Sequence, residues 1–451
     1  MENKGGKYEA LFRQQSVWKA IFSMAIPALL TIVIMIFYNM ADLFFIARLG
    51  DTAKVAAVSV VSPVFNIIMA LATMIGVGGS AIIAGAFGAG DKEKAGNVSS
   101  LCFWSAVALG VLTTALLFIF RTPLLNMLGT KPDMEKDART YLLILSCGTV
   151  LMLISSAMGM LLRAEGAVKE GMYGNLAGTV TNIALDPLFI LAFGWGVAGA
   201  AVATVIGNLV SACYYIVFVR RRAAVISLDP RRALVQPGQI LPVMALGLPN
   251  AASTVLSGFA STFANNLLAR HGTEAIAAAS AAGKASMLIS MVQMGICMGI
   301  QPLLAYSCGA RDLSRMKETL KKTALLTGCI GVGTMLLCFV LRGPIISLFL
   351  KDAEAAAVGQ RYMLYVMAGT PFLGLVYIST NFLQAAKKAT AAIIVSLLRQ
   401  GLLLIPLLFL MHALFGLYGL AAANMTADIA AAVTAGVIFL IQFKKTVREL
   451  A

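Results

Sequence analysis

The sequence contains little charge for its length. Only 12% of its 451 residues are Asp, Glu, Lys or Arg, whereas 59% are hydrophobic and the mean hydropathy is +0.87. A soluble globular domain usually has about 25% charged and roughly 45–50% apolar residues. The composition therefore excludes an ordinary soluble domain and is typical of an integral membrane protein.

Signatures of catalysis and of cofactor binding are also missing. The sequence has two His, at 271 and 412, and seven Cys without a CxxC pair, so it predicts neither a metal site nor a disulfide framework. The Gly-rich stretch 76–90 lacks the Gly-Lys-Ser/Thr of a phosphate-binding loop. No nucleophile and base stand in a recognisable arrangement. We therefore expect a protein that is not an enzyme and that uses no cofactor.

Apolar segments recur along the whole chain. A helix needs about 20 apolar residues to cross a bilayer, and these segments show no period-2 alternation that would suggest a membrane β-barrel. The sequence predicts an all-α integral membrane protein with twelve transmembrane helices. The predicted spans are 18–46, 56–87, 98–120, 140–162, 173–193, 196–219, 240–268, 275–307, 322–341, 361–385, 389–414 and 417–441.

The net charge of +15 follows the membrane topology. With the N-terminus inside, the cytoplasmic segments hold 23 Lys and Arg and the outer loops hold 10. An excess of Lys and Arg in cytoplasmic loops is the usual rule for membrane proteins. We therefore expect a multi-pass protein of the plasma membrane with both termini in the cytoplasm. Its partners are the lipid bilayer and small molecules, and not nucleic acid.

The chain repeats itself at an almost constant shift. Pro27 corresponds to Pro249, and the segment 194–204 (GWGVAGAAVAT) corresponds to 414–424 (LFGLYGLAAAN). Six spans in each half make the two repeats parallel. Two pseudo-symmetric six-helix lobes with a cavity between them are typical of an alternating-access transporter. We expect this protein to be a monomer. The predicted divisions are an N-terminal lobe at 1–219, a basic cytoplasmic linker at 220–239 and a C-terminal lobe at 240–451.

Three carboxylates fall within predicted spans: Asp42, Asp186 and Asp428. A carboxylate near the centre of a bilayer costs about 2.5–3.5 kcal/mol on insertion scales, so such residues are functional candidates. Polar residues stand four positions apart on single helical faces in three places. These pairs are Asn182 with Asp186, Thr204 with Asn208, and Asn424 with Asp428.

Asp42 and Asp186 are the candidates for binding a coupling ion. Two carboxylates that face each other in a low-dielectric site either share a bound proton or hold a cation such as Na⁺ between them. In the second case Asn182 and Thr204 would supply neutral oxygen ligands. The sequence leaves H⁺ and Na⁺ as alternatives. The position in the second half that corresponds to Asp42 is Ala264, so we expect the coupling chemistry in the N-terminal half.

Further polar residues are candidates for substrate binding or for conformational change. Asn424 and Asp428 could form a second polar site, and Arg399 either reaches the cytoplasmic surface or pairs with a carboxylate. Gln293 lies beside a methionine stripe that contains Met294, and such a stripe faces either lipid or an adaptable binding surface. The remaining polar candidates are Tyr38 and Asn208.

The sequence resembles the MATE (multidrug and toxic compound extrusion) family along nearly its whole length. The segments that carry the resemblance are 25–50 in the first span, 85–91 after the second, 163–190 across the fourth and fifth, 194–208 in the sixth and 299–312 in the eighth. With Arg399 and Gln400 in the eleventh span, it looks closest to the bacterial branch of MepA-type drug exporters.

This resemblance implies a pair of six-helix lobes and export of organic, often cationic, drug-like molecules in exchange for H⁺ or Na⁺. It implies a coupling site at Asp42, Asn182, Asp186 and Thr204, a bend at Pro27, and a proton-linked or structural role for Glu165. One departure is that spans seven and ten lack the acidic residues found there in some members. A flippase for lipid-linked precursors, from the same superfamily, is the main alternative; a channel and a membrane-embedded enzyme are disfavoured.

Overall fold

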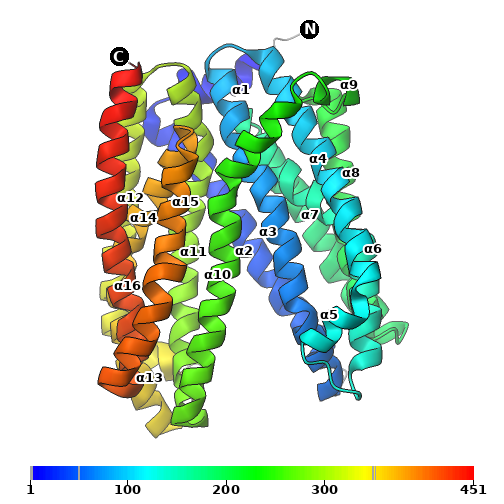
Figure 1. The fold of residues 1–451 in the computed structure, drawn as a ribbon, viewed down its shortest axis with the longest axis vertical. Helices are drawn as coiled ribbons and strands as arrows, with labels where there is room; N and C mark the ends of the chain where they lie inside the picture. Colours follow the sequence, from blue (N-terminus) through cyan, green and yellow to red (C-terminus); the bar gives the residue numbers. More distant parts are fainter. Residues whose placement is uncertain (1–3, 49–50, 348–349, 351, 451) are drawn as a thin grey trace. The chain divides into compact units, whose positions relative to one another are not determined.

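The structure is a computed structural model, and it describes residues 4–48, 51–347, 350 and 352–450. Helices account for most of these residues (Figure 1). In the first half they are α1 (Lys4–Arg13), α2 (Val17–Ala47), α3 (Thr52–Gly88), α4 (Lys92–Ile119), α5 (Arg121–Met127), α6 (Glu135–Ala164), α7 (Val168–Asp186), the π-helix η1 (Pro187–Ala192), α8 (Val197–Arg222) and α9 (Pro230–Ala233).

The second half follows a similar order. Its helices are the 3₁₀-helix η2 (Pro237–Gln239), α10 (Ile240–Leu268), the 3₁₀-helix η3 (Ala269–His271), α11 (Thr273–Gly309), α12 (Leu313–Ser347), α13 (Ala353–Ala368), α14 (Thr370–Ala385), α15 (Ala389–Leu397), the π-helix η4 (Leu398–Leu403) and α16 (Leu404–Leu450).

The all-α membrane fold is confirmed. Among the described residues, 11 helical segments are long and apolar enough to span a membrane. The last of them, Ala389–Leu450, has 62 residues, about three times the length that one crossing needs. It is interrupted at Gly416, where the backbone has φ 58° and ψ −133°. Because this break divides the segment into two spans, it reconciles the 11 segments with the twelve predicted spans.

The backbone carries the internal repeat as well. Gly196, at φ 56° and ψ −128°, has almost the same conformation as Gly416, the position that corresponds to it in the second half. Asp91 begins α4 by accepting the N–H of the residue three positions on, and Asp312 begins α12 in the same way, both at 2.9 Å. A side-chain acceptor at this position satisfies one of the free amides at a helix start. The two halves therefore share local geometry that an alignment of sequence landmarks only suggests.

The chain forms two compact units that exchange the starts of their first long helices. Unit 1 contains residues 1–15 and 30–247, and unit 2 contains 16–29 and 248–451. The first part of α2 thus packs with the second half of the chain, and the start of α10 packs with the first half. The basic segment 220–239 belongs to unit 1.

Glycines allow the exchanged segments to pack closely. A Cβ built on Gly247 in α10 would lie 1.8 Å from the carbonyl oxygen of Met74 in α3, and one on Gly78 would lie 1.9 Å from that of Val243. The corresponding contact in unit 2 joins Gly299 of α11 to Met24 of α2, where a Cβ would lie 3.0 Å from the carbonyl oxygen. Backbones approach this closely only where a side chain is absent.

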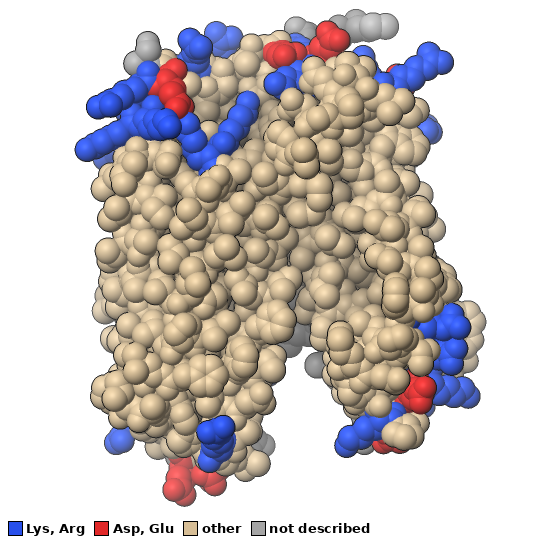
Figure 2. All heavy atoms as spheres, in the orientation of Figure 1, with Lys and Arg blue, Asp and Glu red and all other residues tan. Residues whose placement is uncertain are grey.

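Three interruptions of helical geometry lie near polar residues. The π-helix η1 follows Asp186 directly and begins with Pro187, and η4 contains Arg399. The predicted tenth span is divided into α13 and α14 at Gly369. Short π-helical stretches inside membrane helices frequently occur at functional sites. Charged side chains gather toward the ends of the helices and leave an uncharged band between them, as expected for a bilayer (Figure 2).

Candidate functional site

Close packing of α7 against α8 positions the polar side chains of unit 1. Gly178 and Gly207 face each other, and a Cβ on Gly207 would lie 2.7 Å from the carbonyl oxygen of Gly178. Ser211 and Tyr215 of α8 donate hydrogen bonds to backbone carbonyl oxygens of α7 at 2.8 and 2.7 Å. These contacts fix the register in which polar residues of the two helices meet.

Three of the predicted coupling residues lie in this packed region. The Asn182 amide lies 3.5 Å from the Thr204 hydroxyl, and the exposed fraction of each residue is 2%. Asp186 follows Asn182 by one helical turn and is fully buried. The Oδ1 atom of Asn182 is buried and accepts no hydrogen bond from a described residue. A buried carbonyl oxygen of this kind is available to a cation or to a protonated partner.

The side chains of Asp42 and Tyr38 lie outside the described part of the structure. Their backbone belongs to α2, the helix that also contains Pro27. Pro27 is buried two residues before the point at which α2 passes from unit 2 to unit 1. A proline inside a helix removes one backbone hydrogen bond and favours a kink.

Asn208 extends the polar region of unit 1 toward α6. Its amide donates to the carbonyl oxygen of Thr204 at 2.9 Å, and its Oδ1 accepts a hydrogen bond from the hydroxyl of Ser155 at 2.6 Å. Ser155 is itself buried in α6. The polar residues of α7 and α8 are therefore continuous with a third helix of the same unit.

Glu165 holds the basic segment after α8. Its Oε2 atom accepts the backbone N–H groups of Ala224, Val225 and Ile226 at 3.1, 3.0 and 3.2 Å, and the residue is fully buried. Burial raises the pKa of this carboxyl, and the three N–H groups oppose that rise only in part. Of the two predicted roles, this geometry describes the structural one.

Unit 2 contains a buried ion pair. Arg399 in η4 donates through Nε to Oδ1 of Asp428 in α16 at 2.8 Å, and their side chains are 18% and 11% exposed. Of the two alternatives for Arg399, pairing with a carboxylate is the one observed. Asp428 also borders the break between α13 and α14, where a Cβ on Gly369 would lie 2.9 Å from its Oδ2 atom.

The other candidates of unit 2 lie nearby. Gln293 of α11 is fully buried and donates to the carbonyl oxygen of Thr370 at 3.1 Å, so it supports the broken helix. Met294 is half-buried beside it. Asn424 donates to the carbonyl oxygen of Leu420 at 3.0 Å and lines a cavity of about 460 Å³ inside unit 2.

That cavity was not foreseen from the sequence. It is bounded by α10, α11, α13, η4 and α16, and it takes in Arg399, Gln400 and Asn424. Five serines, none of them a candidate from the sequence, also line it. As for metals, the described residues include no group of three or more His, Cys, Asp or Glu side chains that could hold an ion.

Comparison with known proteins decides the family. The model of the MatE family matches this chain twice, at residues 27–188 and 249–410. The chain belongs to the MatE family. The two matches begin at Pro27 and Pro249, the pair of prolines that the repeat within the sequence aligns. The internal repeat of the sequence is therefore the repeat of the family.

Relatives and solved structures cover almost the whole chain. It is 29% identical over 437 residues to the multidrug export protein MepA of Staphylococcus aureus (strain NCTC 8325 / PS 47), with 97% of this chain and 96% of the relative covered. To MepA of Staphylococcus saprophyticus it is 27% identical over 439 residues, with the same coverage. A crystal structure of MATE in the bent conformation superposes with a TM-score of 0.92 at 22% identity, covering 98% of this chain and 99% of the other. Vibrio cholerae VcmN in the bent form gives 0.87 at 23%, covering 98% of each.

Proposed function

We propose that this protein is a secondary antiporter that exports small organic, drug-like molecules, predominantly cations, in exchange for H⁺ or Na⁺. The observation that carries the proposal is the buried Asp186 one turn from the Asn182–Thr204 contact in unit 1. A buried carboxylate is costly unless its charge is balanced, so binding and release of a cation there would change the local packing. The identity of the MepA relatives as multidrug export proteins supports the same conclusion.

The proposed cycle couples this site to α2. Asp42 lies on α2, the helix that passes from unit 2 to unit 1 just after Pro27. In the outward-open state, an ion that reaches Asp42 and Asp186 neutralises their charge, which lowers affinity for a cationic substrate and favours repacking of α2 near Pro27. The substrate leaves outward, the protein turns inward, and the ion is released to the cytoplasm. Bent and straight conformations of solved MATE structures support a helix rearrangement of this kind.

Both termini are proposed to be cytoplasmic. Within unit 2, Lys388 after α14 bonds Glu449 near the C-terminus at 2.9 Å. At the start of α2, the Trp18 ring lies 5.5 Å from the ammonium of Lys322, which belongs to the first third of α12, after the basic turn that joins α11 to α12. These basic turns are the ones that the excess of Lys and Arg assigns to the inside.

The test is efflux of a fluorescent organic cation from proteoliposomes with H⁺ and Na⁺ gradients imposed separately. We expect one gradient to drive efflux in the native protein and to fail in Asp42→Asn and in Asp186→Asn. Asp133→Asn, which changes an exposed carboxylate, serves as the matched control and should transport normally. Gradient-driven efflux that persists in both site variants would contradict the proposal. Absence of efflux under either gradient, together with translocation of a lipid-linked precursor, would favour a flippase.

A further inference from the structure

The cavity in unit 2 is built from one half of the repeat alone. Its lining residues all lie between 257 and 424, and its volume of about 460 Å³ is in the range of small-molecule sites, roughly 300–1,000 Å³. Two of its residues correspond to coupling residues of the first half, because Ala264 matches Asp42 and Asn424 matches Thr204. The cavity therefore occupies the place in unit 2 that the candidate ion site occupies in unit 1, with different chemistry.

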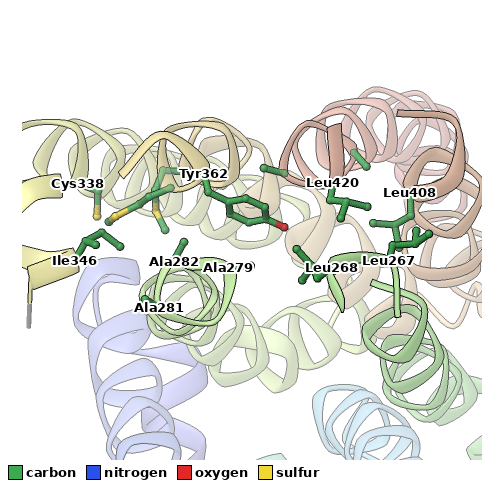
Figure 3. Close-up of a cluster of buried hydrophobic side chains, with 14 of the residues drawn as sticks. Leu267, Leu268, Ala279, Ala281, Ala282, Cys338, Ile346, Tyr362, Leu408 and Leu420 are labelled. Atoms are coloured by element: carbon green, nitrogen blue, oxygen red, sulfur yellow. The ribbon is translucent and has the colours of Figure 1, made fainter. Parts of the chain in front are cut away.

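One side of the cavity is the hydrophobic core of unit 2. Leu268, Ala279, Tyr362 and Leu408 belong both to the lining and to the buried cluster. Figure 3 shows the Tyr362 ring lying within this cluster, with its hydroxyl directed toward the side where Leu268 and Leu420 lie. Such a surface offers an apolar ligand group a place to bury area, at about 25 cal/mol per Å².

The polar side of the cavity contains five serine hydroxyls, which differ from other hydroxyls on the same helices. Two threonines of α10 outside the lining show the usual behaviour. Thr254 and Thr262 of α10 bond the carbonyl oxygen four residues earlier, each at 3.0 Å, as hydroxyls in helices commonly do. The serines that line the cavity form no hydrogen bond with any described residue. These serines are Ser257, Ser261, Ser280, Ser286 and Ser290. Their hydroxyls are thus free to bond water or a ligand.

Arg399 supplies the charge. It lines the cavity, and the hydrogen bond that it donates to Asp428 comes from Nε, one of its five N–H donors. A guanidinium fork matches the two oxygens of a carboxylate. Among the described residues, no carboxylate lines the cavity, and Asp428, the partner of Arg399, is outside the lining.

We propose that this cavity binds the carboxylate group of an organic molecule, with Arg399 as the anion-binding residue and the serine hydroxyls as further donors. Asp428 competes with the ligand for Arg399 and thereby limits its affinity. The proposal deepens the proposed function by adding carboxylate-bearing molecules, zwitterions included, to its substrates. The role of the cavity in export rests on the proposed antiport function. Binding of a carboxylate to the cavity is measured without an ion gradient, so the two proposals can fail separately.

The test compares two fluorescent probes that differ only in charge, dansylglycine and dansylglycinamide, by equilibrium binding to the purified full chain in detergent. We expect dansylglycine to bind at least tenfold more tightly. Asp428→Asn should tighten dansylglycine binding severalfold, because it removes the competing carboxylate. The double variant Arg399→Gln with Asp428→Asn, which leaves no unpaired charge, should bind both probes equally.

A second pair of variants tests the location. A Cβ on Gly283 of α11 would meet no atom within 4 Å, and Gly283 lines the cavity, so Gly283→Leu should fill it and weaken both probes at least tenfold. Gly333→Leu on α12 adds the same group at a position with equal room that is outside the lining of this cavity, and binding should be unchanged. The proposal is overturned by equal affinity of the native protein for the two probes, by no binding of dansylglycine at millimolar concentration, by discrimination that survives in the double variant, or by native affinity for dansylglycine in Gly283→Leu.

Discussion

Gly247 of α10 packs its backbone against the backbone of Met74 in α3, so that a Cβ on Gly247 would lie 1.8 Å from the Met74 carbonyl oxygen. Because the neighbouring atom belongs to the backbone, it cannot move aside as a flexible side chain would. The contact joins the start of α10, the first span of the second half, to α3, the second span of the first half. It is one of the contacts that build unit 1 from both halves of the chain.

Replacement of this glycine should therefore be costly. We expect Gly247→Ala to lower the free energy of unfolding by about 2–3 kcal/mol or more, as overpacking of a close contact usually does. Gly258→Ala in the same helix is the control, since a Cβ there meets nothing within 4 Å and alanine favours a helix by up to about 1 kcal/mol. Thermal unfolding of the purified protein followed by tryptophan fluorescence distinguishes them. Equal melting temperatures for the two variants would contradict the packing described.

The break in α16 depends on Gly416. Its φ of 58° with ψ of −133° is a conformation that only glycine adopts readily. Gly416→Ala should destabilise the protein by about 1–3 kcal/mol. Gly333→Ala, at a helical position with open space around the new Cβ, should be neutral or stabilising in the same unfolding measurement. A Gly416→Ala protein as stable as the native one would mean that the two spans can join without this turn.

Thr204 tests the coupling site without changing its charge. Thr204→Val keeps the shape of the side chain but removes the hydroxyl that lies 3.5 Å from Asn182. Loss of one hydrogen-bonding ligand is worth about 1 kcal/mol, so the ion concentration for half-maximal efflux should rise roughly fivefold. Thr204→Ser keeps the hydroxyl and should remain close to the native value. An unchanged ion dependence in Thr204→Val would remove Thr204 from the site.

Glu165 gives a dependence of stability on pH. Glu165→Ala leaves three buried backbone N–H groups without their acceptor and should cost about 2–3 kcal/mol, whereas Glu165→Gln keeps an acceptor oxygen. Burial raises the pKa of this carboxyl in the folded protein, so folding favours the protonated form. Its contribution to stability is therefore complete below the unfolded pKa of about 4.3 and is lost as the pH rises through the higher folded value. Relative to Glu165→Gln, the native melting temperature should fall as the pH is raised from about 4 to 8. A constant difference between the two would contradict this interpretation.

Hydropathy and the internal repeat were sufficient to predict the membrane fold. The span lengths follow from the thickness of a bilayer, and the repeat that the sequence landmarks reveal appears again in the backbone at Gly196 and Gly416. The exchange of residues 16–29 and 240–247 could not be predicted in this way. Each segment would present the same apolar pattern whether it packed on its own half or on the other, so periodicity does not distinguish the two arrangements.

The site was predictable to a smaller extent. The four-residue spacing of Asn182 and Asp186 predicts a shared helix face, and α7 brings both into a buried region facing α8. The partner of Arg399 depends on how η4 packs against α16, which one sequence does not specify. The serines that line the cavity of unit 2 could not be identified from the sequence. They differ from other helical hydroxyls in forming no hydrogen bond with the backbone of their own helix, and the sequence does not show this. The roles proposed for Asp42, Asn182, Asp186 and Thr204 stay predictions.

The exchanged helix starts also set an order of events during synthesis. Residues 16–29 emerge early, yet the unit in which they pack resumes only at residue 248. Residues 16–29 therefore lack the residues of unit 2 against which they finally pack until the chain has been synthesised beyond residue 248. Unit 1, in turn, is incomplete until residues 240–247 have been inserted. A chain cut between the two halves would therefore yield two fragments, neither able to close its own core, and only their joint expression would restore the protein.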